Sequence, residues 1–323
     1  MERVILGRSN LAVSPVAFGT WQLSPRFWGP QPQDQIAAAM RRAFELGINF
    51  FDTADAYGDG YAETVLGEVI KDLPRDELVV ATKVFNHFKP DGSRYPDLSP
   101  RHLVERCEAS LKRLGIERID LYLLHFYDQL TPLADVAATL LELRDQGKIR
   151  QIGLSNHTVE QVRSQRRFGP YWVVQPPYSL IDPGIEDDLL PYCQAEGIGV
   201  MVYSPLHKGL LTGKYTGQES FDDFRRFHPD FRGRRFVELC HGVQKLAPIA
   251  ARYGLSIPQL VTAVTLMHPA IHVAICGVKT VEQIEELAGA AGKTIDREDF
   301  FAVRSAVDGR AKAKLADAHG VQK

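Results

Sequence analysis

The stretch Ile48–Gly58, which reads INFFDTADAYG, decides the fold. Its apolar beginning predicts a short buried strand, which places Asp52 at the carboxyl end of the strand and Tyr57 in the loop after it. Two later apolar runs end in Lys83 and in His125. Asp, Tyr, Lys and His at or just past the ends of successive strands form a candidate proton-transfer set on a strand-borne scaffold.

Strands of this kind alternate with amphipathic helices along the chain. A short hairpin is expected over residues 3–13, and a further helix near Arg297–Val307 follows the last strand. Eight strands are expected between them, at Val16–Gly19, Ile48–Asp52, Leu78–Lys83, Ile119–His125, Ile149–Ser155, Trp172–Gln175, Gly199–Tyr203 and His272–Cys276. Strict alternation forces parallel strands, and eight units favour closure into a barrel. The predicted fold class is therefore α/β, a (β/α)8 TIM barrel with an N-terminal β-hairpin and a C-terminal extra helix.

The 323 residues are expected to form one barrel domain, because α/β barrels often reach this length. Two segments interrupt the alternation: a longer loop at Phe85–Leu98 and a basic, aromatic-rich loop over residues 204–235. Long loops inside a domain are usually functional or mobile, and our hypothesis is that the second one closes on a cofactor. Residues 317–323 are expected to be disordered.

Composition excludes several classes of function. The net charge of −2 gives no bulk attraction to nucleic acid or to an anionic membrane. No apolar run reaches the roughly 18 residues that a membrane span requires, and residues 1–4 do not begin an apolar signal region. The four cysteines are widely spaced without a CxxC pair, which favours buried thiols in a reduced compartment. We expect a cytoplasmic protein that acts on a small molecule, with its oligomeric state open.

The four polar residues at the strand ends suit the reduction of a carbonyl group. Tyr57 is the natural proton donor, and the ammonium of Lys83 is expected to lower its pKa from the ordinary value of about 10. Asp52 would pair with Lys83, and His125 would bind the carbonyl oxygen or relay a proton. Each residue alone has an ordinary alternative, as a turn aspartate, a solvated lysine, a surface tyrosine or a core histidine. Their combination on successive strand ends favours the catalytic interpretation.

The segments FDTADAYG (51–58), ATKV (81–84) and DLYLLH (120–125) resemble those of the aldo-keto reductases. The resemblance runs from about Val4 to about Ala290 and implies the barrel fold. It also implies that the catalytic residues are Asp52, Tyr57, Lys83 and His125.

The resemblance implies a nicotinamide dinucleotide that is held without a Rossmann motif, because no G-x-G-x-x-G follows the first strand. GLSN (153–156) resembles the family's GxSN segment, and YSPLHKGLLTGK (203–214) resembles its ring-stacking and pyrophosphate loop. Cofactor contacts are implied at Gly19, Thr20, Trp21, Asp52, Ser155, Asn156, Gln175, Tyr203, Ser204, Pro205, Leu206, Gly209, Leu211, Lys214, Arg225, Gly277, Lys279, Gln283 and Glu286. Ser155 and Asn156 could also cap a helix, and Gly209 could be a turn glycine.

The phosphate contacts decide which cofactor is expected. Lys279, at a helix start whose backbone NH groups suit a phosphate, is placed to meet the adenosine 2′-phosphate, which favours NADPH over NADH. Cys276 and Leu287 depart from the family pattern, which usually has Pro and Asn there, and the second change puts one adenine contact in doubt. Arg225 and Arg226 could clamp a phosphate or belong to a solvated basic loop, and Lys279 could be a solvated helix-start lysine.

Aromatic residues on loops at the same end of the barrel are expected to wall the substrate site. The expected substrate-binding residues are Trp21, Tyr57, Phe85, His125 and Phe126, with Trp28 as a further candidate. Such walls suit a small aldehyde or ketone with an apolar face, although ordinary loop anchoring is the alternative. Arg94 and Lys89 could reach an anionic substrate.

The leading interpretation is a metal-independent, NADPH-dependent reductase of aldehydes and ketones, reversible as an alcohol dehydrogenase. NADH is the less favoured cofactor. A second interpretation is a regulatory subunit that binds nucleotide with little turnover, like the potassium-channel β subunits, which retain the same four residues. A third, a metal-dependent barrel hydrolase, would need clustered metal ligands at the strand ends, where His125 alone qualifies.

Overall fold

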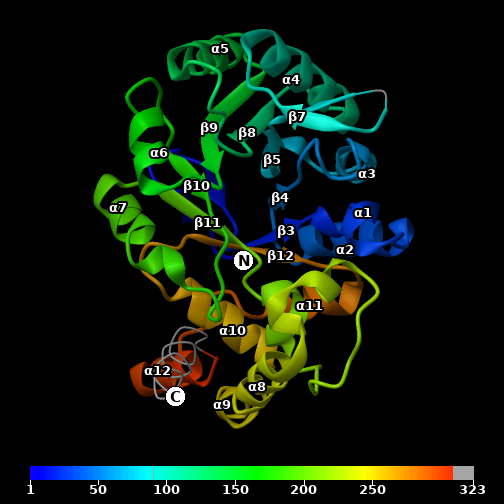
Figure 1. Ribbon diagram of the computed structural model, residues 1–323, viewed down its shortest axis with the longest axis vertical. Coiled ribbons are helices and arrows are strands. Elements are labelled where there is room, and N and C mark those ends of the chain that lie inside the picture. The colour runs from blue at the N-terminus through cyan, green and yellow to red at the C-terminus, as the bar shows by residue number, and fades with distance from the viewer. Residues whose placement is uncertain (90, 308–323) are drawn as a thin grey trace, which may run out of the picture.

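Eight parallel strands close into a barrel at the centre of the computed structural model, which describes residues 1–89 and 91–307 (Figure 1). The strands are β3 (Val16–Gly19), β4 (Phe50–Asp52), β5 (Val79–Val84), β8 (Ile119–Leu124), β9 (Ile149–Ser155), β10 (Val173–Gln175), β11 (Gly199–Tyr203) and β12 (Val273–Gly277). The last strand pairs with the first, with Ile275 opposite Ala17, which closes the ring. The predicted barrel is therefore confirmed.

Helices cover the outside of the barrel and connect its strands (Figure 1). They are α1 (Pro25–Trp28), α2 (Gln33–Glu45), α3 (Tyr61–Ile70), α4 (Pro100–Leu114), α5 (Leu133–Asp145), α6 (Val159–Gln165), α7 (Leu189–Glu196), α8 (Gly233–Gln244), α9 (Ala247–Arg252), α10 (Ile257–Leu266), α11 (Val281–Ala288) and α12 (Arg297–Val307). Side-chain caps define several of their starts. Thr158 and Ser256 form complete capping boxes with the residues three positions on, which satisfies backbone groups that the first turn leaves free. The expected C-terminal extra helix is α12.

The strand residues form two cores, because successive side chains of a strand point to opposite faces. In β8, Leu121 and Leu123 belong to the cluster inside the barrel, whereas Tyr122 and Leu124 belong to the cluster between barrel and helices. The inner face holds the barrel's own packing, and the outer face fastens the helical layer. Both faces are buried, so these strands read as nearly continuous apolar runs in the sequence.

The predicted N-terminal hairpin is present as β1 (Val4–Ile5) and β2 (Ala12–Val13). Leu6, Leu11 and Val13 join the cluster inside the barrel, so the hairpin plugs the end of the barrel opposite the strand carboxyl ends. At the turn, a Cβ on Gly7 would lie 2.1 Å from the backbone nitrogen of Gly199. Gly7 also has φ of 54°, so this close approach requires glycine.

The two expected loops are more ordered than predicted. Phe85–Leu98 is not a plain loop, because β6 (Asn86–Phe88) and β7 (Arg94–Pro96) form an antiparallel hairpin within it. The segment 204–235 contains three short 3₁₀ helices and the start of α8. These helices are η4 (His207–Thr212), η5 (Phe224–Phe227) and η6 (Pro229–Phe231), and further 3₁₀ turns are η1 (Trp21–Leu23), η2 (Arg75–Glu77) and η3 (Gly184–Glu186). The predicted disorder of residues 317–323 lies outside the described residues.

The structure also bears on the expectations about membrane spans and cysteines. Within residues 1–89 and 91–307, the helices are too short or too polar to cross a bilayer. Cys107, Cys193, Cys240 and Cys276 are all buried with free thiols, as expected.

Candidate active site

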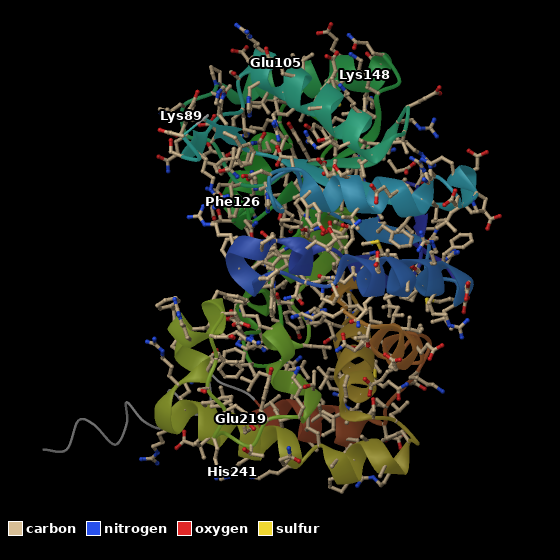
Figure 2. All side chains as sticks on the ribbon, turned by 90° about the vertical axis from the view of Figure 1, so that its right-hand side faces the viewer. Lys89, Glu105, Phe126, Lys148, Glu219 and His241 are labelled. Atoms are coloured by element: carbon tan, nitrogen blue, oxygen red, sulfur yellow. The ribbon has the colours of Figure 1, made fainter. Side chains whose placement is uncertain are left out.

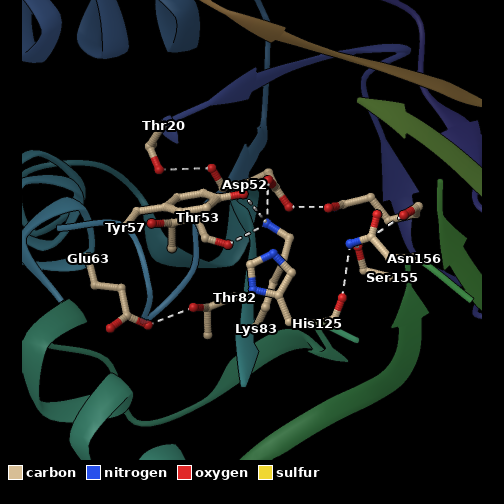
Figure 3. Close-up of polar contacts among 11 residues, drawn as sticks. Thr20, Asp52, Thr53, Tyr57, Glu63, Thr82, Lys83, His125, Ser155 and Asn156 are labelled. Carbon is tan, nitrogen blue, oxygen red and sulfur yellow. Dashed lines mark hydrogen bonds and ion pairs between the residues drawn. The ribbon is translucent and has the colours of Figure 1, made fainter. Parts of the chain in front are cut away.

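The structure brings Asp52, Tyr57, Lys83 and His125 together at the carboxyl end of the barrel strands (Figure 3). Lys83 Nζ donates hydrogen bonds to Oδ1 of Asp52 at 2.7 Å, to the carbonyl of Thr53 at 2.7 Å and to the hydroxyl of Tyr57 at 3.2 Å. The Lys83 side chain is fully buried, so its three donors are satisfied by these protein groups. The Tyr57 and His125 rings meet edge to face with centroids 6.0 Å apart.

Burial and charge set the protonation of this group. Burial opposes the ammonium of Lys83, but Asp52 and Tyr57 attract it and raise its pKa above the ordinary value. Burial likewise raises the pKa of Asp52, against the attraction of Lys83 and the hydrogen bond from Gln175. Burial, Lys83 and Arg94 hold the pKa of His125 well below its ordinary value. The site therefore contains a charged lysine and a neutral histidine.

The expected lowering of the Tyr57 pKa was wrong in its net direction. Burial raises the pKa of the phenol by more than Lys83 lowers it, and Asp52 raises it further. Low polarity disfavours the charged phenolate, and one ammonium that is already paired with a carboxylate compensates only in part. Tyr57 is therefore a neutral phenol with its proton in place.

A continuous chain of hydrogen bonds joins this group to the predicted nicotinamide contacts (Figure 3). Gln175 Nε2 donates to Oδ2 of Asp52 at 2.7 Å, and the hydroxyl of Ser155 donates to the carbonyl of Gln175 at 3.0 Å. Asn156 Nδ2 donates to the Ser155 hydroxyl at 3.0 Å, and Tyr203 donates its hydroxyl proton to Asn156 Oδ1 at 2.7 Å. These side chains are consequently fixed in orientation at the strand ends.

Asn156 adopts a left-handed backbone conformation, with φ of 58°. Asparagine tolerates this conformation better than most residues, and here it allows Nδ2 to donate to the carbonyl of His125 at 3.0 Å as well. The predicted alternative, that Ser155 and Asn156 cap the next helix, is not what the structure contains, because the cap of α6 is Thr158.

Two buried carboxylates near the site are paired with arginines, and sequence reasoning missed these pairs. Thr82 donates to Oε1 of Glu63 at 2.6 Å, and Arg113 donates to Oε2 of the same carboxylate at 2.6 Å. Arg106 donates to Oδ2 of Asp55 at 2.9 Å, while Oδ1 of Asp55 is buried without a hydrogen-bond partner. Burial accordingly raises the pKa of Asp55 to about 7. Glu63 lies on α3, where an acidic residue reads as an ordinary helix position, and Asp55 lies in the loop between β4 and α3.

A cavity of about 720 Å³ opens at this end of the barrel and collects most of the predicted site residues. Its lining includes the predicted residues Gly19, Trp21, Asp52, Tyr57, Phe85, His125, Phe126, Ser155, Asn156, Gln175, Tyr203, Ser204, Pro205, Leu206, Gly209, Lys214, Arg225, Gly277, Lys279, Gln283 and Glu286, and the further candidates Trp28 and Arg94. Its lining also includes residues that sequence reasoning did not select: Gln22, Phe27, Ala56, Asn86, Lys208, Thr212, Tyr215, Pro258 and Ile275.

Three predicted residues stand behind the cavity wall. Lys83 reaches the site only through Tyr57 and Asp52. Thr20 is buried, and its hydroxyl donates to the carbonyl of Asp52 at 3.1 Å, so it supports the catalytic strand. Leu211 is fully buried in the outer core, where its side chain packs rather than faces the cavity.

Aromatic side chains from distant parts of the chain form a cluster at one side of the cavity. Phe224, in η5, packs against Trp21, Phe27 and Trp28 with ring centroids 5.1, 6.3 and 4.9 Å away. The segment 204–235 thus lies across the cavity and rests on α1. This contact was not predictable from local pattern, since its partners are about two hundred positions apart.

Three cations of the cavity lining, Lys214, Arg225 and Lys279, lie close enough to interact electrostatically. Arg225 and Lys279 both lie over the Trp28 ring, 5.3 and 4.8 Å from its centroid. Burial lowers the pKa of Lys279, and repulsion by the cations Arg225 and Lys214 lowers it further. The negative charge of Asp223 raises this pKa, but by less than the other effects lower it. Arg225 is the less available cation, because Asp223 accepts its hydrogen bonds at 2.5 to 3.1 Å.

The two residues that depart from the family pattern both line the cavity. The Cys276 thiol is buried and contacts the carbonyl of Ala274 at 3.8 Å. Leu287, on α11, is almost fully buried and packs in the outer core. An adenine at this place would therefore meet an apolar wall in addition to Gln283 and Glu286.

Comparison with known proteins assigns the chain to a class. The Aldo/keto reductase family profile matches residues 15–308. The chain therefore belongs to the aldo-keto reductases, a family of oxidoreductases that use a nicotinamide cofactor, and the resemblance noted in the sequence is confirmed.

Particular relatives make the assignment more concrete. The chain is 36% identical to aldo-keto reductase YhdN of Bacillus subtilis (strain 168), over 93% of this chain and 91% of that protein. It is 33% identical to the NADH-specific methylglyoxal reductase of Escherichia coli (strain K12), over 94% of this chain and 98% of that protein. Among solved structures, the glycerol dehydrogenase from Gluconobacter oxydans superposes with a TM-score of 0.85 at 30% identity, covering 92% of each chain.

Proposed function

We propose that this protein reduces small aldehydes and ketones to alcohols, reversibly, with NADPH as the preferred cofactor. The observation that carries the proposal is the contact of the buried Lys83 ammonium with both Tyr57 and Asp52. A buried lysine between a phenol and a carboxylate, at the mouth of a cavity, is an arrangement suited to proton transfer.

Tyr57 is proposed as the acid that protonates the developing alkoxide. Its raised pKa keeps the proton on the phenol, and Lys83, at 3.2 Å, is placed to stabilise the phenolate that remains after transfer. Asp52 keeps Lys83 charged and directed, with a contact of 2.7 Å. The neutral His125 faces the same cavity and is proposed to hold the carbonyl oxygen of the substrate by a hydrogen bond.

The cavity fits a dinucleotide in size and in polarity. Its volume of about 720 Å³ lies within the range of ligand pockets. Two buried polar atoms of its lining residues, Gln22 Oε1 and Trp28 Nε1, have no hydrogen-bond partner, which leaves bonding capacity for a ligand. A bound nicotinamide cofactor would supply the hydride, and Ser155, Asn156, Gln175 and Tyr203 would hold its ring.

The preference for NADPH rests on the cation cluster. Lys279 faces the cavity, has its pKa lowered by burial and by neighbouring cations, and would regain favourable electrostatics by binding a dianionic 2′-phosphate. The Escherichia coli relative carries the name of an NADH-specific enzyme, so NADH is the competing cofactor.

The substrate is proposed to be small and partly apolar. Phe85 and Phe126 pack together with ring centroids 5.2 Å apart, and His125 stacks on Phe126 at 4.8 Å. The names of two relatives, a methylglyoxal reductase and a glycerol dehydrogenase, suggest small carbonyl or alcohol compounds with a second polar group. Arg94 lines the same part of the cavity and would attract such a group if it were anionic.

The test is a titration of the purified protein with NADPH and with NADH by nucleotide fluorescence, followed by an assay on a panel of small aldehydes and ketones. Binding of NADPH tighter than NADH, with oxidation of the nucleotide in the presence of carbonyl substrate, is the expected result. Tight binding without turnover on any carbonyl compound would favour the regulatory subunit instead.

A further inference from the structure

A second group of chemically active side chains lies beside the cavity, on the β6–β7 hairpin and the start of α4. His87 stands in β6, Asp97 follows β7 and His102 is in the first turns of α4. One nitrogen of each histidine and one oxygen of Asp97 all lie within 4.8 Å of one another. Figure 2 labels Lys89 on the hairpin and Glu105 on α4, which mark the two elements that meet here.

The nitrogen of His102 that faces this group carries a lone pair. Its other nitrogen, Nε2, lies 3.1 Å from the backbone carbonyl of Asn86, and a carbonyl can only accept, so Nε2 must hold the proton. In the neutral ring Nδ1 is then an acceptor, and it lies 3.9 Å from Oδ2 of Asp97. Metal-binding histidines usually have this arrangement, in which the other ring N–H donates to a backbone carbonyl and fixes the ring.

One carboxylate oxygen of Asp97 also faces the two histidines. Oδ1 accepts the backbone N–H of Ser99 at 2.9 Å, which leaves Oδ2 to face the histidines. Oδ2 lies 3.4 Å from His87 Nδ1 and 3.9 Å from His102 Nδ1. His87 Nδ1 is buried and forms no hydrogen bond despite this short distance. Three potential ligand atoms, Nδ1 of each histidine and Oδ2 of Asp97, thus lie close together.

A similar group near η4 shows what a self-satisfied cluster looks like. His207 Nε2 contacts Oδ2 of Asp230 at 2.8 Å, and its Nδ1 contacts the Ser179 hydroxyl at 2.9 Å. His228 Nδ1 accepts the backbone N–H of Asp230 at 3.3 Å. Every one of these ligand atoms already has a partner, and a bond of 2.8 Å leaves no room for an ion. The group of His207, His228 and Asp230 therefore stabilises the segment 204–235, and we do not propose it as a metal site.

We propose that His87, Asp97 and His102 bind a divalent transition-metal ion of the Zn²⁺ class. Imidazole nitrogen and carboxylate oxygen are its ordinary ligands, at about 2.0–2.2 Å, which puts tetrahedral ligand atoms roughly 3.4 Å apart. The separation of 3.4 Å between Asp97 and His87 meets this value, and the separation of 3.9 Å to His102 exceeds it only slightly. A fourth ligand would be a water molecule, since three protein ligands leave one tetrahedral position unfilled.

The neighbouring charges permit a cation at this place. Arg106 repels positive charge near His102, but it is engaged with Asp55 at 2.9 Å and with the Phe88 ring at 5.0 Å. Glu105, one turn further along α4, is paired with Arg101 at 2.7 Å, so these two exposed charges largely offset each other.

Such an ion would tie the hairpin to α4 next to the substrate end of the cavity. Phe85 and Asn86 precede or begin β6 and Arg94 begins β7, and all three line the cavity. The ion would take no part in the reaction, since its ligands do not line the cavity. It would act by stiffening the part of the wall that receives the substrate.

The proposal is tested on the untagged full chain by isothermal titration with ZnCl₂ in a buffer that does not bind metal. One Zn²⁺ per chain is expected, together with slower amide exchange over residues 86–88 and 94–96, and no heat with MgCl₂, which prefers oxygen ligands. Neither readout depends on enzymatic activity, so the outcome is separate from that of the proposed reductase function.

Three variants identify the ligands. Asp97→Asn keeps the bond to Ser99 and His87→Gln changes a half-exposed side chain, so both should fold, as thermal melting will verify. Each is expected to weaken Zn²⁺ binding by at least about tenfold, the loss that even an outer-shell substitution produces. His241→Gln, on the exposed surface of α8, is the matched control and should bind as the original protein does. Absence of Zn²⁺ binding, or equal binding by all variants, would overturn the proposal.

Discussion

Gln175 Nε2 donates a 2.7 Å hydrogen bond to Oδ2 of Asp52, across 123 positions of the chain. Lys83 occupies the other oxygen of the same carboxylate at 2.7 Å. Gln175 also lines the cavity, so one side chain both completes the surroundings of the buried carboxylate and faces the expected nicotinamide. Its role therefore extends beyond a cofactor contact.

Replacement of Gln175 by Leu should weaken folding. The variant leaves Oδ2 of a buried carboxylate without its donor, which should lower the free energy of unfolding by about 1–3 kcal/mol. Urea unfolding measures this loss. Gln165→Leu is the matched control, because Gln165 is equally buried but its Oε1 already lacks a partner. An equal loss in both variants would contradict a specific role for the contact with Asp52.

Replacement of Tyr57 by Phe should remove the proton donor and little else. The turnover number for carbonyl reduction should fall by about 10²- to 10⁴-fold, the range of general acid catalysis, while NADPH binding stays nearly unchanged. Steady-state kinetics and nucleotide fluorescence measure the two effects. If binding fell in proportion to turnover, Tyr57 would have a structural role instead.

Replacement of Asp55 by Asn should change how stability depends on pH. The folded pKa of about 7 lies above the unfolded value of about 4, so between these values the folded protein binds more protons. This residue therefore makes the free energy of unfolding fall as pH rises through that window, by at most about 1.4 kcal/mol per pH unit.

The stability of Asp55→Asn relative to the original protein should accordingly increase from pH 4 to pH 7 and then level off. Urea unfolding at several pH values provides the comparison. Asp59→Asn, at an exposed position of the same loop whose φ of 54° suits asparagine, is the control. Parallel curves for the original protein and Asp55→Asn would refute the raised pKa.

Replacement of Lys279 by Glu should separate the two cofactors. The Kd for NADPH should rise by about 10- to 100-fold, because a carboxylate would repel the 2′-phosphate, while the Kd for NADH should change little. Lys293→Glu, an exposed position beyond α11, makes the same charge change away from the cavity. An unchanged ratio of the two dissociation constants would remove Lys279 from the phosphate site.

The barrel and the strand-end positions of the four candidate catalytic residues were predictable because they follow from local pattern. Apolar runs ending in Asp52, Lys83 and His125 place those side chains at one end of a parallel sheet, whatever the rest of the chain does. The hairpin β6–β7 was not predictable in the same way. Its strands are short, partly exposed and end in Pro96, so they carry none of the apolar alternation that marks a strand.

Other features depend on burial or on distant contacts that a sequence does not display. The pKa of Tyr57 was expected to fall because the neighbouring Lys83 could be read from the motif, but the desolvation that outweighs it could not. The contact of Phe224 with Trp21 joins two segments with no shared pattern. The hydrogen bonds of the buried Glu63 likewise depend on Thr82 and Arg113, which come from two other elements.

The N-terminal plug has a consequence for the order of assembly. Leu6 and Leu11 fill a space that exists only when the barrel is closed, and Gly7 forms a bridge with Ile198. The plug precedes every barrel strand in the sequence, yet its binding surface is complete only when the last strand has joined the first. These contacts join residues far apart in the sequence, and such contacts are expected to form late in folding.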